Sequence, residues 1–281
     1  MDENRLPFAK AVIWILVSTL LISGTSLMGW LYFLQLKNKR FHDDQYKITS
    51  IIQNLHQEDA LTTTFLAEKL DLSVDNPINL YQFNVKEGEK KLLNESIFKR
   101  VNIKKILPGT LYVNYELRKP MAILGDFSNT LIDSKGVLFP FQPFFSVNQL
   151  SVFYLGLEKS GWKWGDRLSQ MQHFDLGKKI LNDFKKMNLF GFIVESIDLS
   201  QLASESDGKR EIILKLKIDG KSFYLRLGLN QWELAITNFL TLYEWKFNQS
   251  KMGFKNQTLF DFRIPHLGFI QEKEGNQAVP A

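Results

Sequence analysis

An uncharged apolar segment near the N-terminus constrains the fold of this chain more than any other feature. Residues 11–36 run for 26 positions without a charged side chain, and Ile, Leu, Val, Trp and Phe dominate them. As a helix this segment would be roughly 39 Å long, enough to cross a hydrocarbon core of about 30 Å with some tilt. No comparable stretch follows it. We therefore expect a single transmembrane anchor at 11–36.

A cleavable signal peptide is the alternative, because Arg5 and Lys10 precede the apolar segment and small residues occupy 23–26. The apolar core of a signal peptide is about 7–15 residues long, whereas this segment continues to Leu36. A retained anchor is therefore favoured. Orientation is weakly indicated: four Lys and Arg residues at 37–47 outnumber Arg5 and Lys10, which slightly favours an N-terminus outside the cytoplasm.

The composition of the chain is that of one or two ordinary globular domains behind the anchor. It has 281 residues, 23% of them charged and 13% aromatic, so it is long enough to bury a sizeable core. The net charge of +5 is spread along the chain rather than gathered into a patch, which argues against a nucleic-acid partner. The absence of cysteine excludes disulfides, thiolate metal sites and thiol nucleophiles.

The pattern of the first folded part predicts the order strand, helix, helix, strand, strand. A strand is expected within 47–53, a helix capped by one of the threonines at 62–64, and a second helix near 85–97. Alternating apolar residues at 101–103 and 111–117 flank the turn Pro108-Gly109 and predict a hairpin. This order indicates a small α+β module with its helices on one face of a three-stranded sheet.

The second folded part is richer in strands. Apolar residues alternate at 212–218 and 223–227 around Asp219-Gly220, which predicts a hairpin. Helices are expected at 176–187 and after Asn230, where aromatic residues at helical spacing are interpreted as core rather than as a ligand site. A last strand is expected at 258–264, with a candidate continuation at 268–270. So late in the chain it is readily placed at a sheet edge, where unpaired backbone groups invite another chain; a paired interior strand is the alternative.

No constellation of residues indicates catalysis, a metal or a cofactor. The four histidines, at 42, 56, 173 and 266, lie far apart and lack H-E-x-x-H spacing. Nucleophile elbows, P-loops and dinucleotide fingerprints are missing. Ser-x-x-Lys occurs at 96, 160 and 206, but the accompanying S-D-N and K-T-G boxes of penicillin-binding enzymes are absent, so chance explains these matches. We predict no enzyme activity, no cofactor and no small-molecule substrate.

Short motifs nevertheless follow one another in a specific order behind the anchor. They are Asn79-Leu80, Phe83-Asn84, Val101 and Ile103, Leu107-Pro108-Gly109-Thr110-Leu111, Arg118-Lys119-Pro120-Met121-Ala122, Leu131-Ile132-Asp133 with Gly136 and Phe139, and Asp261-Phe262-Arg263. Together they resemble the FtsQ/DivIB family of cell-division proteins, whose POTRA-type module ends in similar P-x-T-L and E-R-x-P-x-A signatures. The resemblance covers the anchor and most of 47–270.

The residue patterns and the resemblance together predict a domain plan. Its parts are a cytoplasmic tail at 1–10, the anchor at 11–36, a juxtamembrane spacer at 37–46, a POTRA-like domain at 47–118, an FtsQ-type β domain at 119–271 and a disordered tail at 272–281. The resemblance also implies a bacterial inner-membrane protein that crosses the membrane once, with its N-terminus in the cytoplasm and its bulk in the periplasm. On this point the resemblance takes precedence over the flanking-charge count.

The resemblance further implies a non-catalytic scaffold of the divisome, the assembly of division proteins at the septum. Partners similar to FtsB and FtsL would add a strand to an exposed edge. By position, the partner-binding residues would be Arg263, Ile264, Gly268, Phe269 and Ile270, although an aromatic residue is common in the family where Ile264 stands. Two alternatives stay open: an anchored POTRA-type secretion or assembly component that handles client polypeptides, and an anchored cell-wall enzyme.

Overall fold

The computed structural model describes residues 8–54, 60–145, 150–157, 161–168, 172–187, 191–204, 206–250, 254–264 and 267–272. The predicted C-terminal tail after residue 272, residues 1–7 of the predicted N-terminal tail, His56 and His266 lie outside these residues. The chain divides into two compact units, Met1–Asn94 with Arg100–Glu116 and Glu95–Lys99 with Leu117–Ala281.

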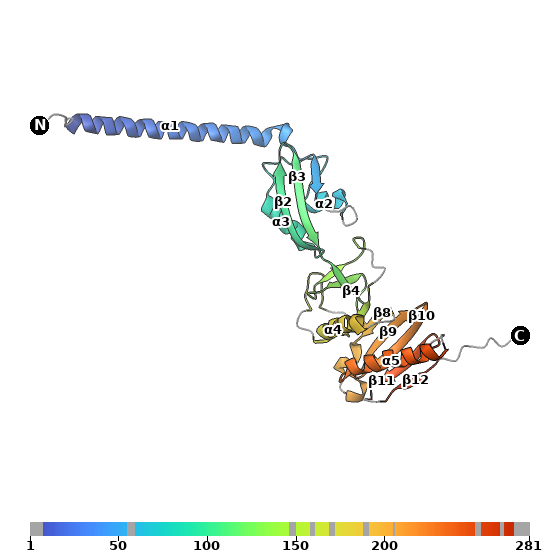
Figure 1. The fold of residues 1–281 in the computed structure, drawn as a ribbon. Helices are drawn as coiled ribbons and strands as arrows, with labels where there is room; N and C mark the ends of the chain where they lie inside the picture. The colour runs from blue at the N-terminus through green and yellow to red at the C-terminus, as the bar shows by residue number, and fades with distance from the viewer. Residues whose placement is uncertain are drawn as a thin grey trace. The chain divides into compact units, whose positions relative to one another are not determined.

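Helix α1 (Phe8–His42) contains the predicted anchor and continues beyond it (Figure 1). Within the described chain it is the one helix long and apolar enough to cross a membrane, and its apolar side chains are exposed. Residues 37–42 of the predicted spacer are the last turns of this helix, and a 3-10 helix at Asp44–Tyr46 follows. The predicted spacer is therefore mostly helical.

Side chains of the first unit hold the C-terminal end of α1. The buried Asn79 amide donates from Nδ2 to the carbonyl oxygens of Arg40, at 2.9 Å, and Asp43, at 3.3 Å. Gln82 Nε2 donates to the Phe41 carbonyl at 3.1 Å. The last carbonyls of a helix have no partner within it, so these amides satisfy groups that would otherwise need water. The helix end is thus fastened to the unit that follows it.

The first unit has the predicted order of elements. They are β1 (Ser50–Gln53), α2 (Thr63–Lys69), α3 (Val85–Asn94), β2 (Phe98–Ile106) and β3 (Thr110–Leu117). The sheet order is β1-β3-β2, with β1 parallel to β3. Thr62 caps α2 by accepting a hydrogen bond from the Phe65 N–H. A Cβ at Gly88 of α3 would meet Leu70 and Ile103, so the helices pack closely against the sheet.

The second unit contains a nine-stranded mixed sheet with two helices. Its elements are β4 (Pro120–Leu124), β5 (Thr130–Asp133), β6 (Leu138–Pro140), β7 (Val152–Tyr154), α4 (Gln172–Met187), β8 (Ile193–Asp198), 3-10 helices at Ser200–Ala203 and Asp207–Lys209, β9 (Ile212–Ile218), β10 (Lys221–Leu227), α5 (Trp232–Ser250), β11 (Thr258–Phe262) and β12 (Phe269–Gln271). The sheet order is β12-β11-β10-β9-β8-β7-β4-β5-β6. β9 and β10 form the predicted hairpin, and both turn residues, Asp219 and Gly220, have positive φ.

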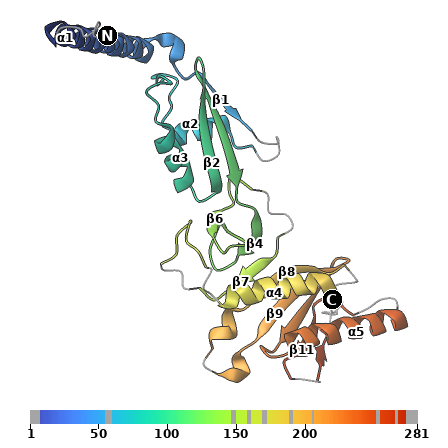
Figure 2. The ribbon, with the colours of Figure 1, turned by 60° about the vertical axis from the view of Figure 1, so that its left-hand side comes forward.

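Helices α4 and α5 pack beside each other on one face of this sheet (Figure 2). Alternate residues of β9 and β10 are fully buried under them, which the period-2 pattern predicted. Aromatic rings fill the core: the Phe260 centroid lies 5.0 Å from that of Phe239 and 4.8 Å from that of Phe254. The aromatic residues of α5 are therefore core, as predicted. Together with the apolar N-terminal helix, the two sheets confirm the predicted α+β class.

Candidate functional site

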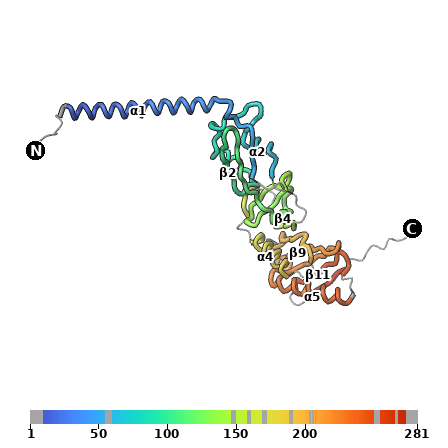
Figure 3. Tube along the Cα trace, turned by 45° about the horizontal axis from the view of Figure 1, so that its top comes forward, coloured from blue at the N-terminus to red at the C-terminus, as the bar shows by residue number. Residues whose placement is uncertain are grey.

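The predicted partner-binding residues lie at one end of the large sheet. β11 pairs in parallel with β10 and antiparallel with β12, so it is an interior strand. The expectation that the strand at 258–264 forms the edge is wrong, because the three-residue strand β12 folds back and covers it. The edge is β12, which contains Phe269 and Ile270, with Gly268 directly before it. Figure 3 follows the chain through β9, α5 and β11 in this region.

Apolar side chains are exposed at this edge. Phe269 is 59% exposed and Ile270 is 44% exposed, and Ile264 and Leu267, in the segment before β12, are also exposed. An edge strand presents a row of unpaired backbone N–H and C=O groups beside its side chains. Among the described residues no strand pairs with the outer side of β12, so its outward backbone groups lie beside apolar surface, which is what an added strand requires.

The register of β12 places its two apolar side chains on opposite faces. Ile270 lies opposite Phe260, which is buried under the helices, and Phe269 lies opposite Asp261 on the other face. Directly opposite residues of an antiparallel pair share a face of the sheet. A strand added to β12 would therefore find an apolar neighbour on each face, one near α5 and one on the open side.

Arg263 has a different environment from the other predicted residues. Its Nε donates to Asp261 Oδ1 at 2.9 Å, its Nη2 donates to Asp261 Oδ2 at 2.7 Å, and its Nη1 lies 3.2 Å from Glu211 Oε2. Arg226 Nη2 donates to the same Glu211 oxygen at 2.6 Å and Arg226 Nη1 donates to Asp261 Oδ2 at 3.3 Å. The four side chains form one network that fixes the end of β11. Arg263 thus acts on the site by holding this strand end.

The network also sets the protonation of its acid. Burial alone would raise the pKa of Asp261, but hydrogen bonds from Arg263 outweigh burial and hold this pKa below its ordinary value. The same carboxylate raises the pKa of the Arg263 guanidinium. Both groups are therefore charged at neutral pH, and the ion pair is intact under physiological conditions.

A groove of about 790 Å³ lies beside the edge. Its walls include Asp261, Arg263, Ile264 and Phe269, so the structure brings four residues of the late strand region into one surface. Arg210 and Leu229 also line it, and sequence reasoning missed both. Leu229 ends the apolar alternation just before α5 and could have been suspected as an exposed apolar residue, whereas no sequence signal marks Arg210.

The opposite edge of the same sheet is closed. β6 is fully buried, and the Leu138 N–H donates to the Asp166 carbonyl at 2.9 Å while the Gly165 N–H donates to the Leu138 carbonyl at 2.7 Å. Pro140, which ends β6, has no N–H to offer. The segment 161–168 therefore occupies the N–H and C=O of Leu138, whereas no strand among the described residues pairs with the outer side of β12.

The described residues form no metal-binding cluster, and the two described histidines contact backbone carbonyls. Among the described residues no group of three His, Cys, Asp or Glu side chains could hold a metal ion. His42 Nδ1 contacts the Asn38 carbonyl at the end of α1, and His173 Nδ1 contacts the Leu155 carbonyl. Comparison with protein-family models and with curated proteins finds no match for this chain. Its function is therefore inferred from its motifs and geometry.

Proposed function

We propose that this protein is a non-catalytic scaffold of bacterial cell division, anchored in the inner membrane and similar in role to FtsQ/DivIB proteins. The observation that carries the proposal is β12, an open edge strand with exposed Phe269 and Ile270 at the end of a nine-stranded sheet. Support also comes from the long apolar helix α1 and from the order of the sequence motifs.

The proposed mechanism is binding by strand addition. An FtsB-like or FtsL-like partner contributes an extended segment whose backbone pairs with β12, and its alternate side chains contact Ile270 on one face and Phe269 on the other. The groove beside Phe269 accepts a side chain of that segment. Anchoring both proteins in one membrane raises their effective concentration, so individually weak contacts suffice. No cofactor, nucleic acid or small-molecule substrate takes part.

The proposed topology has the N-terminus in the cytoplasm and both folded units in the periplasm. The division partners implied by the resemblance act on that side of the inner membrane. Protease added to spheroplasts should then degrade the region after residue 47. Protection of this region until the membrane is permeabilised would reverse the topology and end the proposal.

The partner-binding test exchanges one apolar side chain of the edge for a charge. In the full chain, Ile270→Lys should lower recovery of an FtsB-like partner by about tenfold or more, because a lysine on an edge strand opposes pairing. Ile193→Lys is the matched control, since Ile193 is exposed on β8, away from the edge. Equal recovery with both variants would remove β12 from the site. Arg263→Glu is a poorer test because it would also break the network that holds β11.

The cellular test separates division from secretion. Depletion of the protein should give filamentous, undivided cells if it is a division scaffold. Accumulated precursors of exported proteins with normal septa would instead assign it to secretion or assembly. Covalent labelling of the purified chain by penicillin would instead support the alternative of an anchored cell-wall enzyme.

A further inference from the structure

Cations and aromatic rings meet where α1 joins the rest of the first unit. We call Lys37, Arg40, Phe41, Tyr46 and Tyr81 the junction cluster. Lys37, Arg40 and Phe41 share one face of the last turns of α1, because they are spaced by three and four residues. The Lys37 Nζ lies 5.5 Å from the centre of the Phe41 ring, and the Arg40 guanidinium lies 5.8 Å from the centre of the Tyr81 ring. The helix end and a loop residue before α3 therefore build one surface.

The rings of the junction cluster contact one another edge to face. The Tyr81 centroid lies 5.0 Å from that of Tyr46 and 6.4 Å from that of Phe41. The neighbouring Asn79 and Gln82 amides bind the carbonyls at the end of α1, as described above. These contacts favour one placement of the two cations before a ligand arrives, which lowers the entropy lost on binding.

The carboxylates that follow the cluster in the sequence are already engaged. Asp44 pairs with Lys47 at 2.8 Å, and Asp43 Oδ1 accepts a backbone N–H of the 3-10 helix at 3.0 Å. In the part of the chain that the structure describes, Lys37 and Arg40 are exposed and form no ion pair. Their positive charge is therefore not neutralised within the protein, and its complement is an anion.

The position of the cluster along α1 selects the kind of anion. At 1.5 Å per residue, Lys37 and Arg40 lie about 1.5 and 6 Å beyond Leu36, the last residue of the apolar segment. The polar headgroup layer extends about 5–7 Å beyond the hydrocarbon core on each side of a bilayer. When α1 crosses a membrane, both cations therefore lie at the depth of the lipid headgroups. Aromatic rings are also enriched at this depth in membrane proteins.

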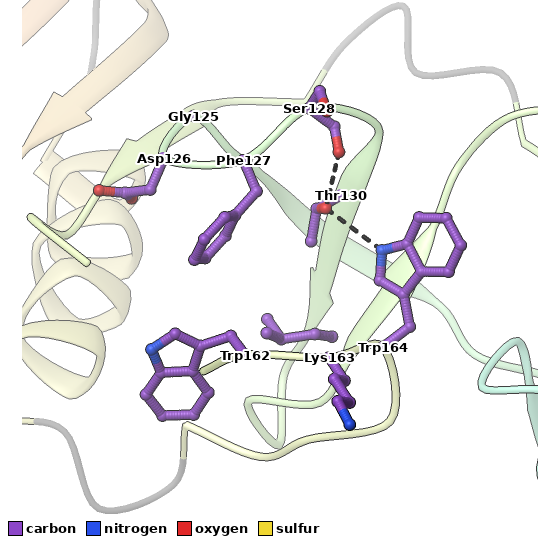
Figure 4. A pocket seen from close by; sticks show the side chains of 9 residues that line it. Gly125, Asp126, Phe127, Ser128, Thr130, Trp162, Lys163 and Trp164 are labelled. Atoms are coloured by element: carbon purple, nitrogen blue, oxygen red, sulfur yellow. Dashed lines mark hydrogen bonds between the residues drawn. The ribbon is translucent and has the colours of Figure 1, made fainter. Parts of the chain in front are cut away.

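The aromatic cavity of the second unit lacks this combination. Phe127, Trp162 and Trp164 surround a space of about 810 Å³ at the β4–β5 turn (Figure 4). Phe127 and Trp162 also pack against the core, and the Lys163 side chain leads away from the rings. Among the residues drawn there, the cavity offers rings without a cation over them, so charge selects no ligand for it.

We propose that the junction cluster binds the headgroup of an anionic phospholipid such as phosphatidylglycerol, with Lys37 and Arg40 on its phosphate. The inference rests on the membrane anchor of the proposed function but not on its division partners. An acidic protein segment carries the same charge, but it would have to displace lipid to reach this depth. A bound headgroup would couple the first unit to the membrane surface, because Tyr81 belongs to the folded part of that unit.

The test compares spin-labelled phosphatidylglycerol with spin-labelled phosphatidylcholine, by electron paramagnetic resonance, on the full chain in phosphatidylcholine vesicles. The natural chain should prefer phosphatidylglycerol, and Arg40→Gln should lower the ratio of the two association constants by about fivefold, the effect of one cation at an anionic headgroup. Lys39→Gln is the matched control, because Lys39 is exposed on the same turn but lies off the face that Lys37 and Arg40 share. It should change the ratio by less than about twofold.

Two variants of Tyr81 separate a built site from general attraction to the charged helix end. Tyr81→Ala removes a ring and no charge, and it should also lower the ratio while leaving the circular dichroism spectrum unchanged. Tyr81→Phe keeps the ring and should preserve the ratio. Equal losses in Arg40→Gln and Lys39→Gln, or an unchanged ratio in Tyr81→Ala, would overturn the proposal, because the headgroups would then respond to net charge alone.

The same vesicles distinguish failure of this inference from failure of the proposed function. A ratio near one in a chain that stays in the vesicles would overturn the lipid site and leave the anchor intact. A chain that alkaline carbonate removes from the vesicles would contradict the anchor as well. Loss of the preference on addition of inorganic phosphate at constant ionic strength would assign the cluster to a soluble phosphate. Displacement of the labelled lipid by a polyglutamate peptide would assign it to an acidic protein segment.

Discussion

The edge strands β2 and β12 are built in opposite ways. β2 is nine residues long, and its exposed residues include Lys99, Arg100, Lys104 and Lys105. The backbone N–H of Ile103 in β2 is already taken, because it donates to Glu89 Oε1 of α3 at 2.9 Å. β12 is three residues long and uncharged, and exposes Phe269 and Ile270. Charge and covered N–H groups keep an edge from pairing. Side-chain chemistry, rather than strand length, therefore decides which edge is available.

The largest expected effect is a difference in stability between two Phe→Ala variants, one in the interior strand β11 and one in the edge strand β12. Phe260→Ala should destabilise the second unit by about 3–5 kcal/mol, because Phe260 is fully buried among aromatic rings. Phe269→Ala should change stability by less than about 0.5 kcal/mol. Hydrogen exchange of the β10 and β11 amides in the full chain measures both. Similar losses in the two variants would show that β12 is not an open edge.

A second experiment should convert the closed edge into an open one. The double variant Lys104→Val, Lys105→Val removes two cations from β2 and should raise self-association of the full chain by about tenfold, which corresponds to roughly 1.4 kcal/mol. Sedimentation velocity in a matched detergent measures the change. The control is Lys86→Val, Lys90→Val, on exposed positions of α3. If only the control pair promotes association, charge is not what closes β2.

A third, smaller effect concerns the carboxylate that covers β2. Glu89→Ala removes the acceptor of the Ile103 N–H and should cost about 1 kcal/mol of stability in the first unit. Glu87→Ala, on the same helix, is the control, because Glu87 pairs with Lys91 at the surface and should contribute less. Amide exchange at Ile103 should quicken in the first variant alone. An unchanged rate would mean that Glu89 does not protect the edge.

The smallest expected effect is the pH dependence of the network behind β12. Since the pKa of Asp261 is lowered in the folded state, its stabilisation is present above about pH 4 and is lost as the pH falls through the folded-state pKa. The stability difference between the natural chain and Asp261→Asn should therefore shrink as the pH falls below about 4. Thermal unfolding between pH 3 and 7 measures it, with Asp219→Asn in the β9–β10 turn as control. A difference independent of pH would contradict the role of the ion pair.

Local sequence patterns were sufficient for elements stabilised by their own periodicity. The alternation at 212–218 and 223–227 around Asp219-Gly220 predicted β9 and β10. Residues close together in the sequence determine both the buried face and the turn of this hairpin. The helical spacing after Asn230 likewise predicted α5 and its buried aromatic face. The order of elements in the first unit followed from the same rules.

Elements that depend on distant partners were harder to predict. β7 and β12 have three residues each, too few for a period to show, and β7 is ordered by parallel pairing with β4 and β8. The prediction that the strand at 258–264 lies at the sheet edge was wrong for the same reason. Only its pairing with the short strand β12 makes β11 an interior strand. The ion pairs of Arg263 join residues up to 52 positions apart, Glu211 being the most distant. No sequence window contains that information.

The connection between β10 and β11 has a consequence for assembly. β11 lies beside β10 only after the chain has crossed over through α5, and β12 adds itself to β11 afterwards. Until residues 258–271 have been synthesised and have folded, the large sheet ends at β10 and the edge strand β12 is not formed. A partner that selects β12 would consequently ignore nascent or half-folded copies. Binding would then also select for complete folding, because only molecules with a fully folded second unit would enter the complex.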